Sequence, residues 1–152
     1  MSGAILCCVN DSVHARRAVE VAVEMAAGLG RGLTFLLVNR VRPASGHPPI
    51  KAISAGKAKE VLDIAMRYAE AHGVREARPA LAEAKDVAEA ILRFASETGA
   101  SDTGAGKTGA GEHAIGHIVV GTGNPPFIGR LLLGSVSEAV VAGAACSVTV
   151  AR

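Results

Sequence analysis

The sequence predicts a doubly wound α/β domain built on a five-stranded parallel sheet. Short runs of Val, Ile and Leu alternate with longer segments in which apolar residues recur every three or four positions. The apolar runs are typical of parallel strands covered on both faces, and the helical spacing predicts the helices that cover them. Right-handed crossovers then place the carboxyl ends of the strands on one rim of the sheet, where ligands bind in such folds.

Each expected strand is a short apolar segment bounded by Gly, Pro or polar residues. The third segment contains Pro79, which lacks a backbone N–H and therefore favours the edge of the sheet. The last segment is also expected at an edge. The expected strands are Ala4–Val9, Leu33–Asn39, Arg78–Ala82, Ile118–Val120 and Cys146–Ala151.

Residues suited to helix ends stand between these strands. Ser12 is placed to cap the first helix, and Gly30 can adopt the left-handed conformation that ends it. The second helix is expected to close at Gly73. Asp86 is placed to cap the third helix, and the last one begins at Gly134-Ser135, so every crossover between strands contains a helix.

Two segments fall outside this alternation. Arg42–Gly56 contains several Pro and Gly residues, which predicts a connection that is partly mobile. Ser101–Gly116 is rich in glycine and low in complexity, which predicts a flexible insertion. We expect residues 1–152 to form a single domain that carries this insertion.

Composition narrows the class of protein. The formal net charge is +2 and aromatic residues are 3%, so neither a basic stripe nor a stacking surface points to a nucleic-acid partner. No apolar run approaches the roughly 20 residues of a membrane span, and the N-terminal segment lacks a signal-peptide pattern. The three cysteines, two of them adjacent, are typical of reduced thiols, so the sequence predicts a cytoplasmic protein.

The segment after the fourth strand has the form of an anion-binding site. Gly121-Thr122-Gly123 ends the strand, and a helix begins at Gly134-Ser135. Unpaired N–H groups and the helix dipole favour a phosphate there. A purely structural reading stays open, because Ser135 and Glu138 fit an S-x-x-E capping box. The two readings are compatible, since both use donors of the first helical turn.

Three segments together resemble the universal stress protein family over nearly the whole chain. Ile5–Ser12 is similar to the family's opening, I-L-V-x-V-D-x-S, and Ala88–Leu92 resembles its third helix. Gly121–Ser135 resembles its nucleotide signature, Gly-x2-Gly-x9-Gly-Ser/Thr, and Val136-Ser137-Glu138 continues the match. The resemblance is to the ATP-binding subgroup, and it implies a Rossmann-like fold of the adenine nucleotide alpha hydrolase-like kind.

The resemblance implies a bound adenine nucleotide, either ATP, ADP or AMP, with Mg²⁺ as an optional companion of the phosphates. The adenine would insert between strand ends, the ribose would lie near Asn10 and Gly121, and the phosphates would meet the amides and hydroxyls of the last helix. The residues expected to bind the nucleotide are Cys8, Val9, Asn10, Val38, Val120, Gly121, Gly123, Asn124, Gly134, Ser135, Val136 and Ser137.

The chain departs from the family's pattern at the site itself. Asn124 stands at the second glycine of the signature, and Pro125-Pro126, which have no backbone N–H, follow it. Asn10 replaces the opening aspartate, which removes charge-assisted acceptance from ribose hydroxyls. The glycine-rich insertion separates the third helix from the fourth strand.

Three other motifs do not predict a functional site. Gly104–Thr108 looks like part of a P-loop, but Ser101 stands where the first glycine is needed and the segment follows a helix. His113 and His117 do not share a helix face, so no metal site is expected. No base is predicted beside Ser135, so no catalytic residues are expected and any ATP hydrolysis should be slow and incidental.

We therefore predict a cytoplasmic universal stress protein that binds an adenine nucleotide as a stress-response regulator or sensor. The edge position of Cys146–Ala151 and the resemblance both imply a homodimer through that strand. No membrane or nucleic-acid partner is expected, and the signalling partner stays unknown. The alternative is a dimeric interaction module of the same fold that does not bind nucleotide.

Overall fold

The computed structural model describes residues 3–98, 114–122 and 134–152. Its centre is a mostly parallel sheet in which the strands β3, β2, β1, β5 and β6 lie side by side in that order, and β4 also pairs with β2. The strands are β1 (Ala4–Val9), β2 (Leu33–Ala44), β3 (His47–Lys51), β4 (Ala77–Ala84), β5 (Ile115–Gly121) and β6 (Ser147–Ala151).

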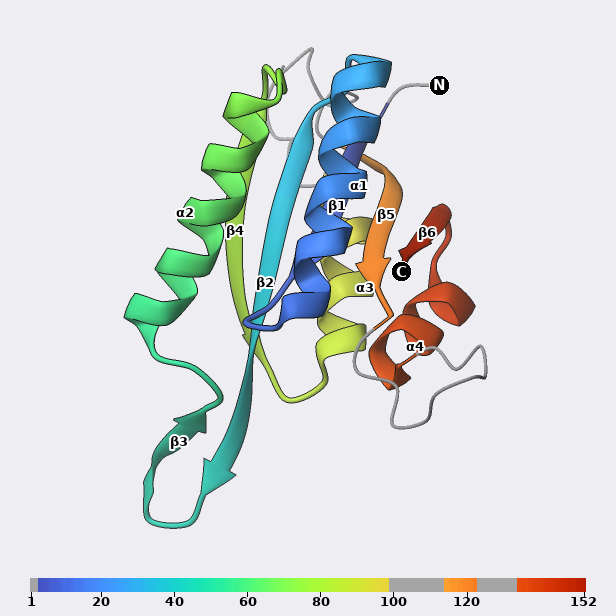
Figure 1. Ribbon diagram of the computed structural model, residues 1–152. Coiled ribbons are helices and arrows are strands. Elements are labelled where there is room, and N and C mark those ends of the chain that lie inside the picture. The colour runs from blue at the N-terminus through green and yellow to red at the C-terminus, as the bar shows by residue number, and fades with distance from the viewer. Residues whose placement is uncertain (1–2, 99–113, 123–133) are drawn as a thin grey trace, which may run out of the picture.

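Helices cover both faces of this sheet (Figure 1). The first two pack on one face, and the last two pack on the other and against each other. The predicted doubly wound α/β fold is confirmed, because parallel strands joined by helices form the sheet. The helices are α1 (Val13–Leu29), α2 (Ala55–Ala71), α3 (Val87–Glu97) and α4 (Ser135–Gly143).

The core lies in two layers because successive side chains of a strand point to opposite faces. Ile5 and Phe35 are fully buried against α1 and α2, whereas Leu6, Leu36 and Ile118 are fully buried on the face that carries α3 and α4. The continuous apolar runs of the sequence therefore supply both layers at once, as expected for a sheet covered on both faces.

The expectation that Arg42–Gly56 is a loop is wrong over most of its length, since strands continue to Lys51 and α2 begins at Ala55. β2 runs on to Ala44, and β3 pairs with it in the antiparallel direction, so the sheet gains a sixth strand. The two strands form a hairpin that projects beyond the rest of the sheet (Figure 1). Gly46, at φ 72°, occupies the turn between them, where a left-handed residue is needed.

Other boundaries shift by a few residues. β5 begins at Ile115, so Ile115 and Gly116 belong to the strand and not to the expected insertion. Ala114 of the insertion precedes the strand, and its carbonyl accepts from the Ala4 N–H at 2.7 Å. The rest of the insertion, residues 101–113, lies outside the described part of the chain, and its flexibility stays a prediction. Both expected edges are confirmed among the described strands, since β6 ends the strand order and β4 pairs with β2 alone.

Helix ends follow the sequence signals in part. Gly30 ends α1 in the left-handed conformation, and Asp86 caps α3 by accepting a hydrogen bond from the Glu89 N–H at 3.0 Å. Ser12 occupies the N-cap position of α1, but its side chain makes no capping hydrogen bond. The expected capping by the Ser12 hydroxyl is therefore wrong.

Candidate functional site

A cavity of about 350 Å³ opens at the carboxyl ends of the parallel strands. β1, β2 and β5 supply its floor, while the starts of α1, α3 and α4 supply its walls. This is the rim on which a doubly wound sheet places its ligands. The described lining residues are Cys8, Val9, Asn10, Ser12, Ala15, Leu36, Val38, Val87, Ile91, Val120, Gly121, Gly134, Ser135, Val136 and Ser137.

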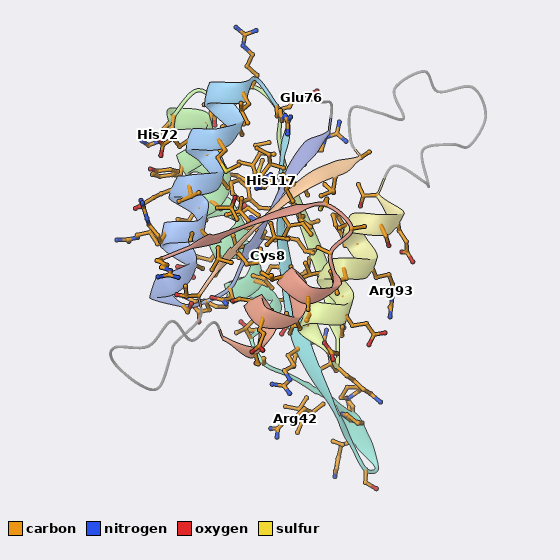
Figure 2. The ribbon with its side chains drawn as sticks, turned by 90° about the vertical axis from the view of Figure 1, so that its right-hand side faces the viewer. Cys8, Arg42, His72, Glu76, Arg93 and His117 are labelled. Carbon is orange, nitrogen blue, oxygen red and sulfur yellow. The ribbon has the colours of Figure 1, made fainter. Side chains whose placement is uncertain are left out.

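The inner part of the cavity is apolar. Leu36 and Val38 of β2 face Val87 and Ile91 of α3, which are one helical turn apart and therefore point the same way. Cys8 lies beside them in the interior (Figure 2). A flat apolar group such as a nucleobase fits this chemistry.

Burial raises the pKa of the Cys8 thiol to about 12. The thiol therefore stays protonated at neutral pH and offers an apolar contact with a weak S–H donor, not a nucleophile. Burial also raises the pKa of Cys7 well above its usual value, and the negative charge of a Cys8 thiolate adds to this effect. Cys7, Cys8 and Cys146 are all free thiols.

The turn after β1 is stabilised by contacts of its own residues and by one contact with α2. The Asn10 Oδ1 atom accepts a hydrogen bond from the Ser12 N–H at 3.0 Å, which closes a turn of the kind that Asn favours. The Lys57 ammonium at the start of α2 lies 3.6 Å from the Asp11 carboxylate and restrains the same turn. Asn10 thus has a local structural role in addition to its place in the cavity wall.

The start of α4 differs from the expected capping box. Gly134 is the N-cap residue and Ser135 is already the first helical residue, so neither Ser135 nor another side chain caps the helix. The Gly134 N–H donates to the Thr122 carbonyl at 2.8 Å, which ties the residue before the helix to the end of β5. The Ser137 hydroxyl donates to the Gly121 carbonyl at 2.5 Å. These bonds hold the first turn of α4 against the end of β5.

The start of α4 is suited to an anion. The first N–H groups of any helix lack intrahelical acceptors, and the helix dipole adds positive potential at that end. Ser135, Val136 and Ser137 belong to this turn and line the cavity. Amide donors and the Ser135 hydroxyl therefore border the same space as the apolar slot.

The residues expected from the sequence come together in one place. Cys8, Val9, Asn10, Val38, Val120 and Gly121 all line the cavity, and so do the residues of α4. Gly123 and Asn124 lie outside the described residues. The structure adds lining residues that were not predicted as site residues, namely Ser12, Ala15, Leu36, Val87 and Ile91.

Two of these additional lining residues, Val87 and Ile91, could have been predicted from the sequence. Val87 and Ile91 stand at the start of a helix that follows a strand, and the start of such a helix lies on the carboxyl rim. They form the apolar face of α3, whose spacing could have placed them beside the strand ends. The pairing of this face with Leu36 and Val38 depends on tertiary packing.

The sequence offered His113 and His117 as possible metal ligands, and no metal site was expected from them. His113 lies outside the described residues, as does the P-loop-like Gly104–Thr108. His117 lies on β5, with its Nε2 atom 2.7 Å from the Thr149 Oγ1 atom of β6. Within residues 3–98, 114–122 and 134–152, His, Cys, Asp and Glu side chains form no group of three or more that could hold a metal ion.

The fold and the cavity together define a Rossmann-like α/β protein with a ligand cavity at the carboxyl rim of its sheet. The model of the universal stress protein family matches residues 1–152, and the chain belongs to that family. No curated protein matches the chain. None of the helices in the described part of the chain is both long enough and apolar enough to cross a lipid bilayer.

Solved structures of the family have the same fold. The universal stress protein UspA from Lactobacillus plantarum is 22% identical with a TM-score of 0.74, covering 99% of this chain and 98% of that one. A universal stress protein in complex with cAMP is 18% identical with a TM-score of 0.70, covering 100% and 98%. The universal stress protein from Archaeoglobus fulgidus in complex with dAMP is 20% identical with a TM-score of 0.64, covering 99% and 98%.

Proposed function

We propose that this chain binds an adenine nucleotide in the cavity at the carboxyl rim and acts as a stress-response regulator or sensor. The observation that carries the proposal is the combination in one cavity of an apolar slot and the first turn of α4. The slot suits a base, and the helix start suits phosphate. The dAMP and cAMP complexes of the similar structures support the choice of an adenine nucleotide.

In this proposal the adenine lies beside Val38 and Val120, with Val87 and Ile91 on its other side. The ribose lies near Asn10, whose carboxamide can both donate and accept hydrogen bonds. The space for the base is set by β2 and α3, and the space for the ribose is set by the turn after β1.

The phosphates would meet the N–H groups of Ser135 and Val136 and the Ser135 hydroxyl. The Ser137 hydroxyl proton is donated to the Gly121 carbonyl, so this proposal assigns the hydroxyl contact with phosphate to Ser135 alone. Ser137 therefore positions the helix and does not donate to phosphate. Mg²⁺ would bind the phosphate oxygens from the solvent side, since the described lining residues are all uncharged.

Native mass spectrometry of the purified protein, followed by calorimetric titration with AMP, ADP and ATP, tests this proposal. A Val87→Trp variant places a large side chain in the slot and should abolish binding. Val141→Trp is the matched control, because Val141 lies on α4 at 45% exposure and does not line the cavity. A wild-type protein that binds none of these nucleotides would contradict the proposal and favour the interaction module.

The regulatory role includes a homodimer formed through β6. This strand ends the sheet among the described strands, and Val148 and Val150 are partly exposed on it. An uncovered edge strand tends to pair with another chain, and a two-fold copy is the common solution. The cytoplasm is the proposed location, in keeping with three free thiols.

A further inference from the structure

One face of the hairpin of β2 and β3 carries positive charge that no acid balances. Residues 25–59 contain no Asp or Glu, and Arg40 and Arg42 within this stretch are exposed. Side chains two residues apart share a face of a strand, so the two arginines lie on one face, about 7 Å apart along β2. Within the described part of the chain, neither guanidinium group has an ion-pair or hydrogen-bond partner. Arg42 lies out on the hairpin (Figure 2).

A third cation stands beside these arginines. Ala84 of β4 pairs in register with Arg40, and Lys85 is the next residue of the chain. Lys85 is exposed, and no residue in the described ranges forms an ion pair or a hydrogen bond with its side chain. The end of β4 therefore adds to the charge of the hairpin.

The acids next to Lys85 in the sequence are engaged in other contacts. The Glu83 Oε1 atom lies 2.6 Å from the Nζ atom of Lys51. Lys51 pairs in register with Val41, so this ion pair lies on the face opposite to the two arginines. Asp86 accepts a hydrogen bond from the Glu89 N–H at 3.0 Å and caps α3. The cations of the hairpin thus remain available to an acidic partner.

Ile50 adds an apolar contact to the same face. It pairs in register with Arg42, so the two side chains lie side by side, and Ile50 is 53% exposed. A single exposed apolar side chain is common and indicates nothing by itself. Here it lies next to arginine, which is enriched in protein interfaces. We call Arg40, Arg42, Ile50 and Lys85 the hairpin surface.

The chemistry of the hairpin surface favours a protein partner. One large apolar side chain is too little for a face that inserts into a membrane. Residues 40–51 contain no Phe, Tyr or Trp on which a nucleic-acid base could stack. Strand addition is also disfavoured, because Pro48 and Pro49 leave two of the five residues of β3 without an N–H. A partner would therefore be held by side chains.

We infer that the hairpin surface binds an acidic segment of a partner protein, in which an apolar residue accompanies two carboxylates. The planar guanidinium group of arginine makes paired, charge-assisted hydrogen bonds with a carboxylate. Alternate side chains of an extended segment are also about 7 Å apart, which matches the spacing of Arg40 and Arg42. The inference goes beyond the nucleotide proposal and does not depend on it, because no residue of the hairpin surface lines the cavity in the described part of the chain.

A fluorescent synthetic peptide tests the inference. Glu and Thr alternate in it, and one central Thr is replaced with Leu. A second peptide has Gln in place of every Glu. Fluorescence anisotropy measures the binding of both peptides to the wild type, to the double variant Arg40→Gln with Arg42→Gln, and to Ile50→Ser.

Two control variants remove exposed side chains of the same kinds elsewhere. Arg67→Gln with Arg75→Gln removes the same charge from exposed arginines beside a cavity between α2 and the start of β4. Ile64→Ser removes an isoleucine of α2 that is 57% exposed. Circular dichroism checks that each variant remains folded.

The wild type should bind the Glu peptide and not the Gln peptide, and added salt should weaken the binding. The double arginine variant should bind about tenfold more weakly, as expected for two exposed ion pairs. Ile50→Ser should also bind more weakly, because an apolar contact is lost. Both controls should keep the wild-type affinity.

Three results would overturn the inference. The first is a wild-type protein that does not bind the Glu peptide. The second is an equal loss of affinity in the control arginine variant, since attraction would then follow net charge and not the hairpin surface. The third is tighter binding of single-stranded RNA or of anionic phospholipid vesicles that the same hairpin substitutions abolish.

Discussion

The Ser137 hydroxyl of α4 donates a hydrogen bond to the Gly121 carbonyl at the end of β5, with 2.5 Å between the two oxygens. Ser137 is only 3% exposed, so this bond is shielded from water. Together with the bond from the Gly134 N–H to the Thr122 carbonyl, it fixes the first turn of α4 beside the strand end. These two bonds hold α4, a wall of the cavity, against β5, which forms part of its floor.

Replacing Ser137 with Ala should destabilise the protein and weaken nucleotide binding together. The loss should be about 1–3 kcal/mol in the free energy of unfolding, because a carbonyl that had a buried partner loses it. Urea unfolding and calorimetric titration measure the two effects. Ser135→Ala is the matched control, since Ser135 caps nothing and should change binding with little change in stability.

Substitution of Asn39 should also lower the free energy of unfolding. Its side chain is 3% exposed and makes two hydrogen bonds with the backbone of Ile53, donating to the carbonyl at 2.8 Å and accepting from the N–H at 3.1 Å. These bonds join β2 to the segment that leads into α2. We expect Asn39→Ala to cost about 2–4 kcal/mol, since two backbone groups lose their partner.

Asn39→Asp separates the two bonds, because a carboxylate accepts from the Ile53 N–H but repels the Ile53 carbonyl. It should therefore also destabilise the protein at neutral pH. Chemical denaturation of both variants provides the measurement. Wild-type stability in either variant would mean that the contact contributes nothing.

Stability should fall in mild acid because of His117. Burial, and secondarily the positive charge of Arg31, lowers the pKa of His117 below its ordinary value of 6.5. The unfolded chain then binds a proton at a higher pH than the folded one, so stability is complete above pH 6.5 and decreases as the pH falls through the folded pKa.

Thermal unfolding of the wild type and of His117→Gln, measured across this range, checks the prediction. The variant should show a flatter dependence on pH. His47→Gln, which removes an exposed histidine of the hairpin, controls for the loss of a titratable group. An equally steep profile for His117→Gln would assign the acid sensitivity to other groups.

The proposed dimer can be tested by proline substitution in β6. The Ala151 carbonyl accepts from the Thr122 N–H, so the polar backbone groups of Ala151 face β5 and those of Val150 face the open edge. Val150→Pro therefore removes an outward donor while sparing the bonds to β5. Sedimentation should show a dimer for the wild type and a shift toward monomer for this variant.

Thr149→Pro is the control for that experiment. Its N–H faces β5, and its hydroxyl is the partner of His117, so this variant should lower the melting temperature directly. A Val150→Pro protein that remains fully dimeric would place the interface elsewhere.

Much of the fold could be predicted because its signals are local. The apolar runs around Leu6, Leu36 and Val119 predicted strands from hydrophobicity alone, and the glycine at position 30 predicted the end of α1. The rule that parallel strands place ligands at their carboxyl ends then gathered Asn10, Val38 and Gly121 into one site before any contact was known.

The hairpin was missed although one signal for it was present. Ser45-Gly46 is a dipeptide typical of a two-residue turn, but Pro43 and Pro48 beside it argue against strands. What stabilises β3 comes from elsewhere in the sequence. Glu83 of β4 pairs with Lys51, and Asn39 binds the backbone at Ile53.

The sequence by itself determined the order of the parallel strands and the helices, the buried layers and the strand ends that form the floor of the cavity, because periodicity and turn residues act over a few neighbouring positions. Only the tertiary structure decided that Val87 and Ile91 form the opposite wall, that Ser137 holds α4 instead of a capping box, and that β2 runs on into a hairpin with β3. These features depend on which surfaces meet after the crossovers close, and packing and hydrogen bonding between distant segments then outweigh local preference.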